Sequence, residues 1–387
     1  MSKNKLYYAG ILLLVAMIMK YGLARYLSLN YNTWLVMGEI ITIMIIGVGF
    51  VLKGTAQIIE ETAEVLSEKT KLATGMLQSL GTAFPDMVLG IMAAIISLRV
   101  AGSDYAKAIN YAIIAAATTF GSNIYNIGYA IWCIGRQNLA NGLNKTIRII
   151  PFLKNAGMVT PIKFHKKKPA LKEFDTANDI LNTLGILTAI VATSMVLFGR
   201  VTIRPVNIDG DLYQLIKPIG WVIFVFALLL MYKFRKTQRT VSPVEEIVAD
   251  EKFFRRQKNW VIWLSLLMSA GAILLAADSM VRAIEIFSVI THIPSVIAGV
   301  AAGLIGCLGE IIATHNHTIN PTGRIGDAVV GVAMDNIVTI IGASIVAIMG
   351  GIFLGGNALI LIFVLILTLN STLIWQISRL KNYFLKA

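Results

Sequence analysis

The segment GTAFPD at residues 81–86 places a hydroxyl, a proline and a carboxylate inside an apolar run long enough to cross a bilayer. Thr82 and Asp86 are four residues apart, so on a helix they share one face. Pro85 has no N–H to bond the carbonyl four residues earlier, and this leaves a backbone oxygen free. Together these groups form an oxygen-only set, which hard cations such as Ca²⁺ prefer.

Two more polar groups repeat this spacing further along the chain. Ser122 and Asn126 are four residues apart in the next apolar run, with Asn123 beside them, and they add neutral oxygens. Asp335 and Thr339 are also four residues apart, with Asn336 in the corresponding place. We therefore expect two sets of oxygen ligands on two different helices.

A further carboxylate, Glu310, lies in an apolar run that contains Gly303, Gly306 and Gly309. The glycines predict a loosened helix that another backbone can approach closely. An ionised side chain in hydrocarbon costs at least a few kcal/mol, so Asp86, Glu310 and Asp335 indicate a functional site. Asn123 and Asn336 are equally open to a second interpretation, as hydrogen-bonding residues between helices.

The composition is that of an integral membrane protein. The 387 residues are 56% hydrophobic and only 14% charged, against about 25% in a soluble domain. The net charge of +13 does not indicate a nucleic-acid partner, because the basic residues cluster in loops between apolar segments. Cys133 and Cys307 lie in apolar segments, which predicts buried thiols and no disulfide framework.

We expect an all-α polytopic membrane protein, because only helices satisfy their own backbone over spans of this length in lipid. About ten spans are predicted, each long enough to cross the bilayer. Their ranges are 6–27, 34–58, 72–98, 107–134, 180–199, 212–233, 259–284, 293–316, 325–350 and 355–377.

The loops alternate in charge. The loop at 135–179 has nine Lys and Arg residues against three acids, and the other loops on the same side are also basic. By the positive-inside rule this side is cytoplasmic, with both termini inside, in a plasma or inner membrane. The run KFHKKK at 163–168 fits this topological role, and the alternative is a patch for anionic lipid.

Two segments of the chain, one in each half, have a similar sequence pattern. Residues 54–86 and 276–310 each contain a helix end, a turn, and an apolar helix with glycines and a carboxylate. An odd number of spans separates the two copies, so they run in opposite directions through the membrane. Inverted repeats of this kind place a transport site at their interface near mid-membrane.

Enzyme chemistry has little support. The sequence has no nucleophile elbow, glycine-rich phosphate loop or HExxH motif, so we expect no catalytic residues and no organic cofactor. The histidines of THNHT at 314–318 could hold Zn²⁺, but a polar turn after a span is the simpler interpretation. Glu60, Glu61 and Glu64 are expected to face water or to cap the mouth of a pore.

The first repeat resembles the cation/Ca²⁺ exchanger superfamily, which includes the Na⁺/Ca²⁺ exchangers. That family carries G-T-S-x-P-E followed one helix later by G-S-N-x-x-N/D, and here the matches are GTAFPD (81–86) and GSNIYN (121–126). The second copy, GCLGE (306–310) and MDNIVT (334–339), has diverged. The resemblance implies two inverted repeats, central acids at Asp86 and Glu310, and alternating-access exchange of Ca²⁺ for Na⁺, K⁺ or H⁺.

The same resemblance implies neutral ligands at Thr82, Ser122 and Asn126. It divides the chain into an extra N-terminal helix, a five-helix repeat, a cytoplasmic linker and a four-helix repeat. Their ranges are 1–33, 34–233, 234–258 and 259–387. The family has a further final helix that this chain lacks, and we expect helix 6–27 to pack in its place.

The departures from the family pattern bear on the coupling ion. Asp86 replaces a longer glutamate, and Ala83, Gly306 and Cys307 replace hydroxyl-bearing residues that help to bind Na⁺ in the family. We expect Na⁺/Ca²⁺ exchange, with Ca²⁺ held between Asp86 and Glu310. The alternatives are exchange of Ca²⁺ or another cation for H⁺, and a non-transporting scaffold or sensor. The expected partners are inorganic cations and the lipid bilayer, and the sequence does not specify an oligomeric state.

Overall fold

The computed structural model describes residues 5–27, 32–70, 74–153, 155–165, 171–202, 211–238, 253–320 and 325–386. Helices occupy all ten ranges predicted to span the membrane. The long helices are α1 (Lys5–Ile18), α3 (Thr33–Ile46), α4 (Lys53–Thr70), α5 (Thr74–Val100), α6 (Tyr105–Leu143), α7 (Leu171–Phe198), α8 (Lys217–Gln238), α9 (Asn259–Thr291), α10 (Ser295–Gly306), α11 (Leu308–Ile319), α12 (Ile325–Met349) and α13 (Gly356–Lys386).

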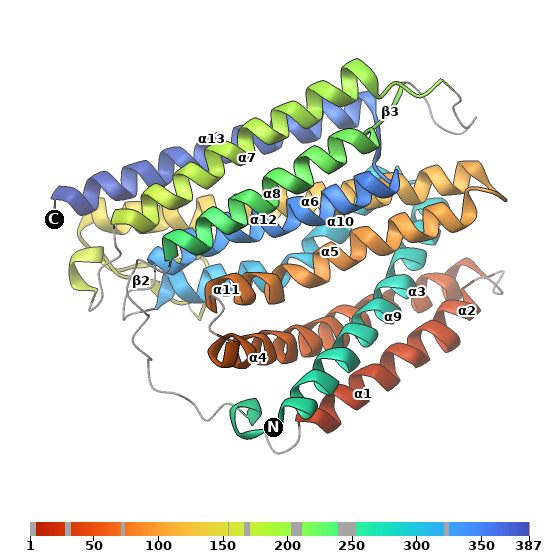
Figure 1. Ribbon diagram of the computed structural model, residues 1–387, viewed down its shortest axis with the longest axis horizontal. Helices are drawn as coiled ribbons and strands as arrows, with labels where there is room; N and C mark the ends of the chain where they lie inside the picture. The colour runs from red at the N-terminus through yellow and green to blue at the C-terminus, as the bar shows by residue number, and fades with distance from the viewer. Residues whose placement is uncertain are drawn as a thin grey trace.

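Within the described residues, six helices are individually long and apolar enough to cross a membrane, and α10 with α11 makes a seventh as a bent pair. The other long helices, α5, α6 and α8, pack among them (Figure 1). The protein is therefore an all-helical, multi-pass membrane protein.

The helices form two groups that cross at an angle (Figure 1). The smaller group consists of α1, the short α2 (Ala24–Tyr26), α3, α4 and α9, which pack mainly against one another. The larger group contains α5 to α8 and α10 to α13. Contacts from α5 to α4 and α9, with a few more from α6 and α10, join the two groups.

The larger group has the pairing expected of an inverted repeat. Helix α5 packs against α12, and its counterpart α10 packs against α6. Likewise α7 packs against α12, and its counterpart α13 packs against α6. Each repeat therefore places its second and fourth helices on the third helix of the other repeat.

Glycines bring α6 and α10 into close contact. A Cβ atom on Gly303 would lie 2.6 Å from the backbone nitrogen of Ser122, and one on Gly121 would lie 2.8 Å from the Cα of Val300. Small residues permit this approach of two helix backbones, because association in lipid depends on packing and not on hydrophobic burial. The glycines thus set how closely the two repeats meet.

Short irregular segments interrupt the long helices. α10 and α11 meet at Cys307 with a bend of 46°. Two π-helical segments, η1 (Met19–Leu23) and η2 (Gly47–Leu52), lie in the smaller group. They lie close together, because a Cβ atom on Gly47 would fall 3.1 Å from the Met19 side chain and 2.7 Å from that of Met280 on α9.

Two small antiparallel sheets cover opposite ends of the larger group. β1 (Ile147–Arg148) pairs with β2 (Met158–Val159) in the loop between α6 and α7. β3 (Leu212–Gln214) pairs with β4 (Phe353–Gly355), which joins the connection before α8 to the connection before α13. The basic loop at 135–179 is therefore an extension of α6, a hairpin and the beginning of α7.

Candidate cation site

The carboxylate of Asp86 lies buried in the middle of α5. The hydroxyl of Ser122 on α6 donates a hydrogen bond of 2.6 Å to its Oδ2. Its Oδ1 is also buried and has no hydrogen-bond partner among the described residues. Of Thr82, expected on the same face, the structure describes the helical backbone but not the side chain.

Glu310 approaches the same region from the second repeat. It is buried in the first turn of α11, directly after the break at Cys307. A Cβ atom on Gly306, at the end of α10, would lie 2.8 Å from Oδ1 of Asp86 and 3.0 Å from its Cα. The glycine therefore lets the break between α10 and α11 touch the Asp86 backbone, and this contact brings the two repeats together at the acids.

Asp335 and Thr339 lie on α12, both buried. The Thr339 hydroxyl donates to the backbone carbonyl of Asp335 at 3.0 Å, so the two residues share one helix face as their spacing predicted. Helix α12 packs against α5 and α11, the helices that carry Asp86 and Glu310. Three buried acids from three helices thus belong to one region.

Several buried oxygens and nitrogens on α5, α6, α11 and α12 have no partner among the described residues. They are Oδ1 of Asp86, Oε1 of Glu310, Oδ1 of Asn123, and both amide atoms of Asn126 and Asn336. Buried polar groups are nearly always hydrogen-bonded or bound to an ion or water. No lysine or arginine within the described residues forms an ion pair with Asp86 or Glu310. The site is therefore an electronegative region suited to a cation.

The acids alone do not form a metal cluster. In the described part of the chain, no three His, Cys, Asp or Glu side chains are arranged to hold one metal ion. A cation here would need hydroxyl, amide and backbone oxygens besides the carboxylates. Such a mixed set of hard ligands is typical of Ca²⁺ and unlike a zinc or copper site.

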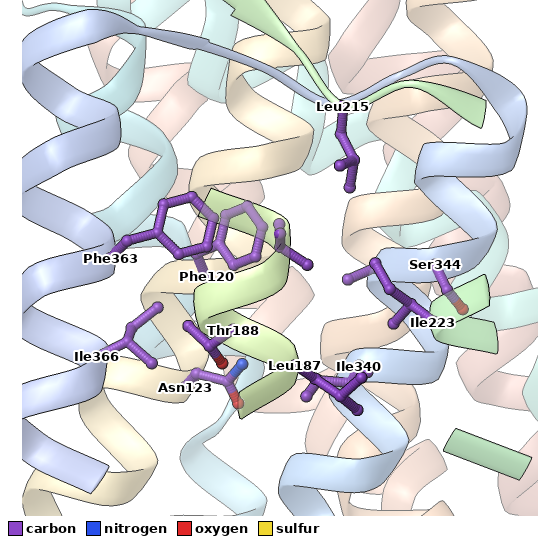
Figure 2. A pocket seen from close by; sticks show the side chains of 12 residues that line it. Phe120, Asn123, Leu187, Thr188, Leu215, Ile223, Ile340, Ser344, Phe363 and Ile366 are labelled. Carbon is purple, nitrogen blue, oxygen red and sulfur yellow. The ribbon is translucent and has the colours of Figure 1, made fainter. Parts of the chain in front are cut away.

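Asn123 lies on a different side of α6 from the Asp86 contact. It lines a cavity of about 30 Å³ between α6, α7, α8, α12 and α13, together with Thr188 and mainly apolar side chains (Figure 2). The Thr188 hydroxyl bonds to the carbonyl of Leu184, so Asn123 is the residue there with an unpartnered oxygen. This volume is enough for a water molecule.

The histidine pair at 315 and 317 does not form a metal site with the neighbouring thiol. Nδ1 of His315 lies 2.6 Å from the Tyr129 hydroxyl on α6, and the two rings stack. Cys133 is buried one turn along α6 and is a free thiol, as the sequence predicted. These contacts fix the end of α11 against α6.

Sequence reasoning missed a buried ionic cluster in the smaller group. Asp278 on α9 is buried, and its Oδ2 lies 3.7 Å from Lys20 Nζ and 3.2 Å from Arg282 Nε. The sequence shows the charged residues but not their contact: Asp278 and Arg282 are four residues apart in an apolar helix, and Lys20 lies near the end of the first span.

A second missed cluster connects the two groups of helices. Glu285 on α9 accepts a hydrogen bond of 3.4 Å from the Tyr111 hydroxyl on α6 and lies 3.9 Å from Lys107 Nζ. Glu61 on α4 is also buried, bound to Lys5 and to the backbone N–H of Phe254, and so it does not face open water. The side chains of Glu60 and Glu64 lie outside the described residues.

The expected place of the first helix is wrong. By the symmetry of the repeats, a fifth helix in repeat two would pack on α6, because its counterpart α8 packs on α12. Helix α1 instead lies against α9, α4 and η2, held by the Lys5–Glu61 and Lys20–Asp278 pairs. The acidic partners of its two lysines lie on α4 and α9, and this explains why α1 packs there.

The arrangement is similar to solved ion exchangers. A crystal structure of an H⁺/Ca²⁺ exchanger, CAX, matches with a TM-score of 0.56 and 13% identity, over 97% of this chain and 94% of that one. Two structures of the sodium–calcium exchanger NCX_Mj match with TM-scores of 0.43 and 0.39, at 14% and 16% identity. They align with 89% and 88% of this chain and 98% of their own.

No protein-family model matches the chain, and no curated protein matches it either. At this level of identity, the similarity to the exchanger CAX is one of overall fold. The inverted pairing of helices and the matching length agree with that similarity. The chain therefore has the fold of the H⁺/Ca²⁺ exchanger structure.

Proposed function

We propose that this protein is a secondary active antiporter that exchanges Ca²⁺ for a monovalent cation. The observation that carries the proposal is the contact of Gly306 with Asp86, which brings together a buried carboxylate of each repeat, each with one oxygen that has no partner among the described residues. Two carboxylates neutralise one divalent cation. The Ser122 hydroxyl lies beside Asp86, and we expect the buried, unpartnered amide of Asn126 to add a further neutral oxygen.

Calcium suits this ligand set better than magnesium. Ca²⁺ accepts six to eight oxygens in flexible geometry, whereas Mg²⁺ releases its waters reluctantly and demands a strict octahedron. The ligands here come from four helices, and several are amide or hydroxyl groups. This mixture provides many weak oxygen ligands, and a transported ion must also be able to leave.

The monovalent ion of the proposal is Na⁺, with H⁺ as the second candidate. Na⁺ is favoured by the neutral oxygens around Ser122 and Asn126, which could coordinate it. H⁺ is favoured by the third buried acid, Asp335, and by the solved structure with the same fold, which is an H⁺/Ca²⁺ exchanger. The loss of hydroxyls at Gly306 and Cys307 also weakens the case for Na⁺.

Alternating access would follow from the two groups of helices. The smaller group crosses the larger one, and the contacts that join them are mostly those of α5, so a sliding of α4 and α9 along α5 would expose the site while the core stays intact. The bond between Glu285 and Tyr111 would have to break in one of the two states. We place the protein in the plasma or inner membrane. We place both termini in the cytoplasm, because the basic loops lie on the same side of the membrane as the termini.

The test is uptake of ⁴⁵Ca²⁺ into proteoliposomes, driven separately by a Na⁺ gradient and by an H⁺ gradient. We expect Asp86→Asn to lower uptake at least about 100-fold, because the remaining charge no longer balances a divalent ion. The matched control is Asp175→Asn, the same change at an exposed carboxylate on α7. It should leave uptake unchanged.

The outcomes separate the candidates. Uptake driven by Na⁺ supports the first coupling ion, and uptake driven by H⁺ alone supports the second. A folded protein with no uptake under either gradient would contradict the proposed function. If Asp86→Asn then raised thermal stability, the chain would be a scaffold and not a transporter.

A further inference from the structure

The loop between α6 and α7 carries a surface that the transport site does not use. β1 and β2 form a hairpin whose connecting turn exposes two large apolar side chains, Phe152 at 93% and Leu153 at 56%. Phe164, just after the hairpin, is 58% exposed. In water these side chains would be unfavourable, so their surroundings need an explanation.

The depth of the hairpin follows from α6. Lys107 and Arg136 are the two charged residues of this helix. They are 29 positions apart, which is a rise of about 44 Å, roughly the bilayer thickness with its head groups. Their midpoint is near Ser122, at the level of the site. Trp132 then lies about 15 Å from the centre, at the edge of the hydrocarbon.

The hairpin is bonded to α6 at that level. Nε1 of Trp132 donates to the carbonyl of Ile149 at 3.0 Å, and Nε of Arg136 donates to the carbonyl of Arg148 at 3.1 Å. β1 therefore runs beside α6 where the hydrocarbon meets the head groups. The exposed tip begins three residues after Ile149, so Phe152 lies within reach of the acyl chains.

The charge of the segment suits a negative surface. Residues 141–165 contain no acid, and the basic side chains of Lys145, Arg148 and Lys163 are exposed. Nζ of Lys163 lies 4.8 Å from the centre of the Phe164 ring, so a cation and an aromatic face share one place. Aromatic rings with Lys and Arg beside them are typical of the head-group layer, and anionic lipids attract such clusters.

The hairpin also contacts the helix that carries Glu310. Gly157 has a φ of +101°, and a Cβ atom there would lie 2.7 Å from Ile319, the last residue of α11. Val159 packs with Ile149 and Cys133 in a small core to which Ile319 contributes. A hairpin fixed in the lipid would thus hold the end of α11, which lies beside β2 in Figure 1.

We propose that the hairpin of residues 147–159 is an interfacial anchor, with Phe152 and Leu153 in the acyl chains and Arg148 and Lys163 on the head groups of anionic phospholipids. This surface is independent of which ions the protein exchanges. It adds a direct contact with the acyl chains to a loop whose charge the sequence explains by topology or by anionic lipid.

The experiment places an NBD fluorophore on Phe152→Cys and reconstitutes the protein in phosphatidylcholine, with and without phosphatidylglycerol. The two native thiols are buried, and unsubstituted protein gives the labelling blank. The control variant is Asn382→Cys, at an exposed residue on α13. The neighbouring Tyr383 donates a hydrogen bond to the carbonyl of Asn141 on α6. Asn141 lies about 28 Å along α6 from Ser122, so position 382 is outside the hydrocarbon. Doxyl-labelled lipids then report contact with acyl chains.

We expect quenching at position 152 to exceed that at position 382 several-fold, and to increase with phosphatidylglycerol. Arg148→Gln should remove that increase, whereas Arg99→Gln, at an exposed arginine of α5, should not. Equal quenching at positions 152 and 382 would overturn the anchor. If quenching at position 152 is strong but does not change with phosphatidylglycerol in any variant, the assignment to anionic lipid is overturned.

Discussion

The two repeats place a carboxylate at the same level by different means. In repeat one, α5 runs without a break from Thr74 to Val100, and Asp86 follows Pro85 inside it. In repeat two, the helix breaks at Cys307, and Glu310 stands in the first turn of the new helix. A helix N-terminus favours negative charge, so the break itself supports the second acid.

The difference explains which motif survives in the sequence. Asp86 is held by the Ser122 hydroxyl, so repeat one needs specific polar side chains at these positions. In repeat two, Gly303 lies against α6 and Gly306 lies against α5. These two positions must therefore lack a side chain, whatever residues surround them. Repeat two therefore shows glycines in its sequence where repeat one shows hydroxyl-bearing residues.

The largest expected effect comes from filling the contact between α10 and α6. Gly303→Leu would place its Cβ 2.6 Å from the Ser122 backbone, which cannot move without displacing α6. We expect loss of the folded protein, since overpacking costs about 1–3 kcal/mol even where side chains can adjust. Size-exclusion chromatography in detergent measures this. Gly331→Leu on α12, where nothing lies within 4 Å, should remain monodisperse.

A smaller change tests the contact that carries the site. Gly306→Ser restores a hydroxyl to repeat two, but its Cβ would lie 2.8 Å from Oδ1 of Asp86. We expect ⁴⁵Ca²⁺ uptake to fall about 100-fold in a folded protein, because a shift of about 1 Å in a key group has effects of this size. The control is Gly331→Ser. Increased uptake would mean that the lost hydroxyl, and not close packing, limits repeat two.

Much of the architecture could be predicted from the sequence because it depends on local properties. Apolar length located a helix in each of the ten predicted ranges, and spacings of four placed Asp335 and Thr339 on one helix face. The glycines of the second repeat predicted a close approach of another backbone, and this is confirmed. Each of these features follows from one segment, without knowledge of its neighbours.

The features that were missed depend on which helices are neighbours. The Lys20–Asp278 pair joins residues 258 positions apart, and a single sequence gives no sign that the two helices touch. The hairpin was also missed, because its strands have two residues each and are fixed by Trp132 and Arg136 on α6. Tertiary contacts determine such short strands, and strand propensity contributes little.

The third prediction concerns α1, which has no counterpart in repeat two. Lys20→Met leaves buried Asp278 with Arg282 alone and should lower stability by about 1–3 kcal/mol, between the values for exposed and buried pairs. Thermal unfolding followed by tryptophan fluorescence measures this. Adding Asp278→Asn should restore most of the loss, because the unpaired charge is then gone. Lys53→Met, at an exposed lysine on α4, should be neutral.

The smallest expected effect concerns the loop between α6 and α7, which contains the hairpin. The corresponding loop of repeat two, between α12 and α13, is only six residues long. His165 is buried after the hairpin, and its Nε2 lies 2.8 Å from the carbonyl of Thr160, while Nδ1 has no partner among the described residues. Burial lowers the pKa of His165 below its ordinary value of 6.5.

The folded loop therefore binds a proton less readily than the unfolded loop does. The stability that neutral His165 contributes is complete above about pH 6.5 and is lost as the pH falls through and below that value. We expect amide hydrogen exchange at residues 158–165, corrected for its intrinsic pH dependence, to rise several-fold between pH 7.5 and about pH 5. His165→Gln should abolish this rise, because glutamine keeps a donor for Thr160 but does not titrate. A rise that persists in the variant would assign the pH response to another group.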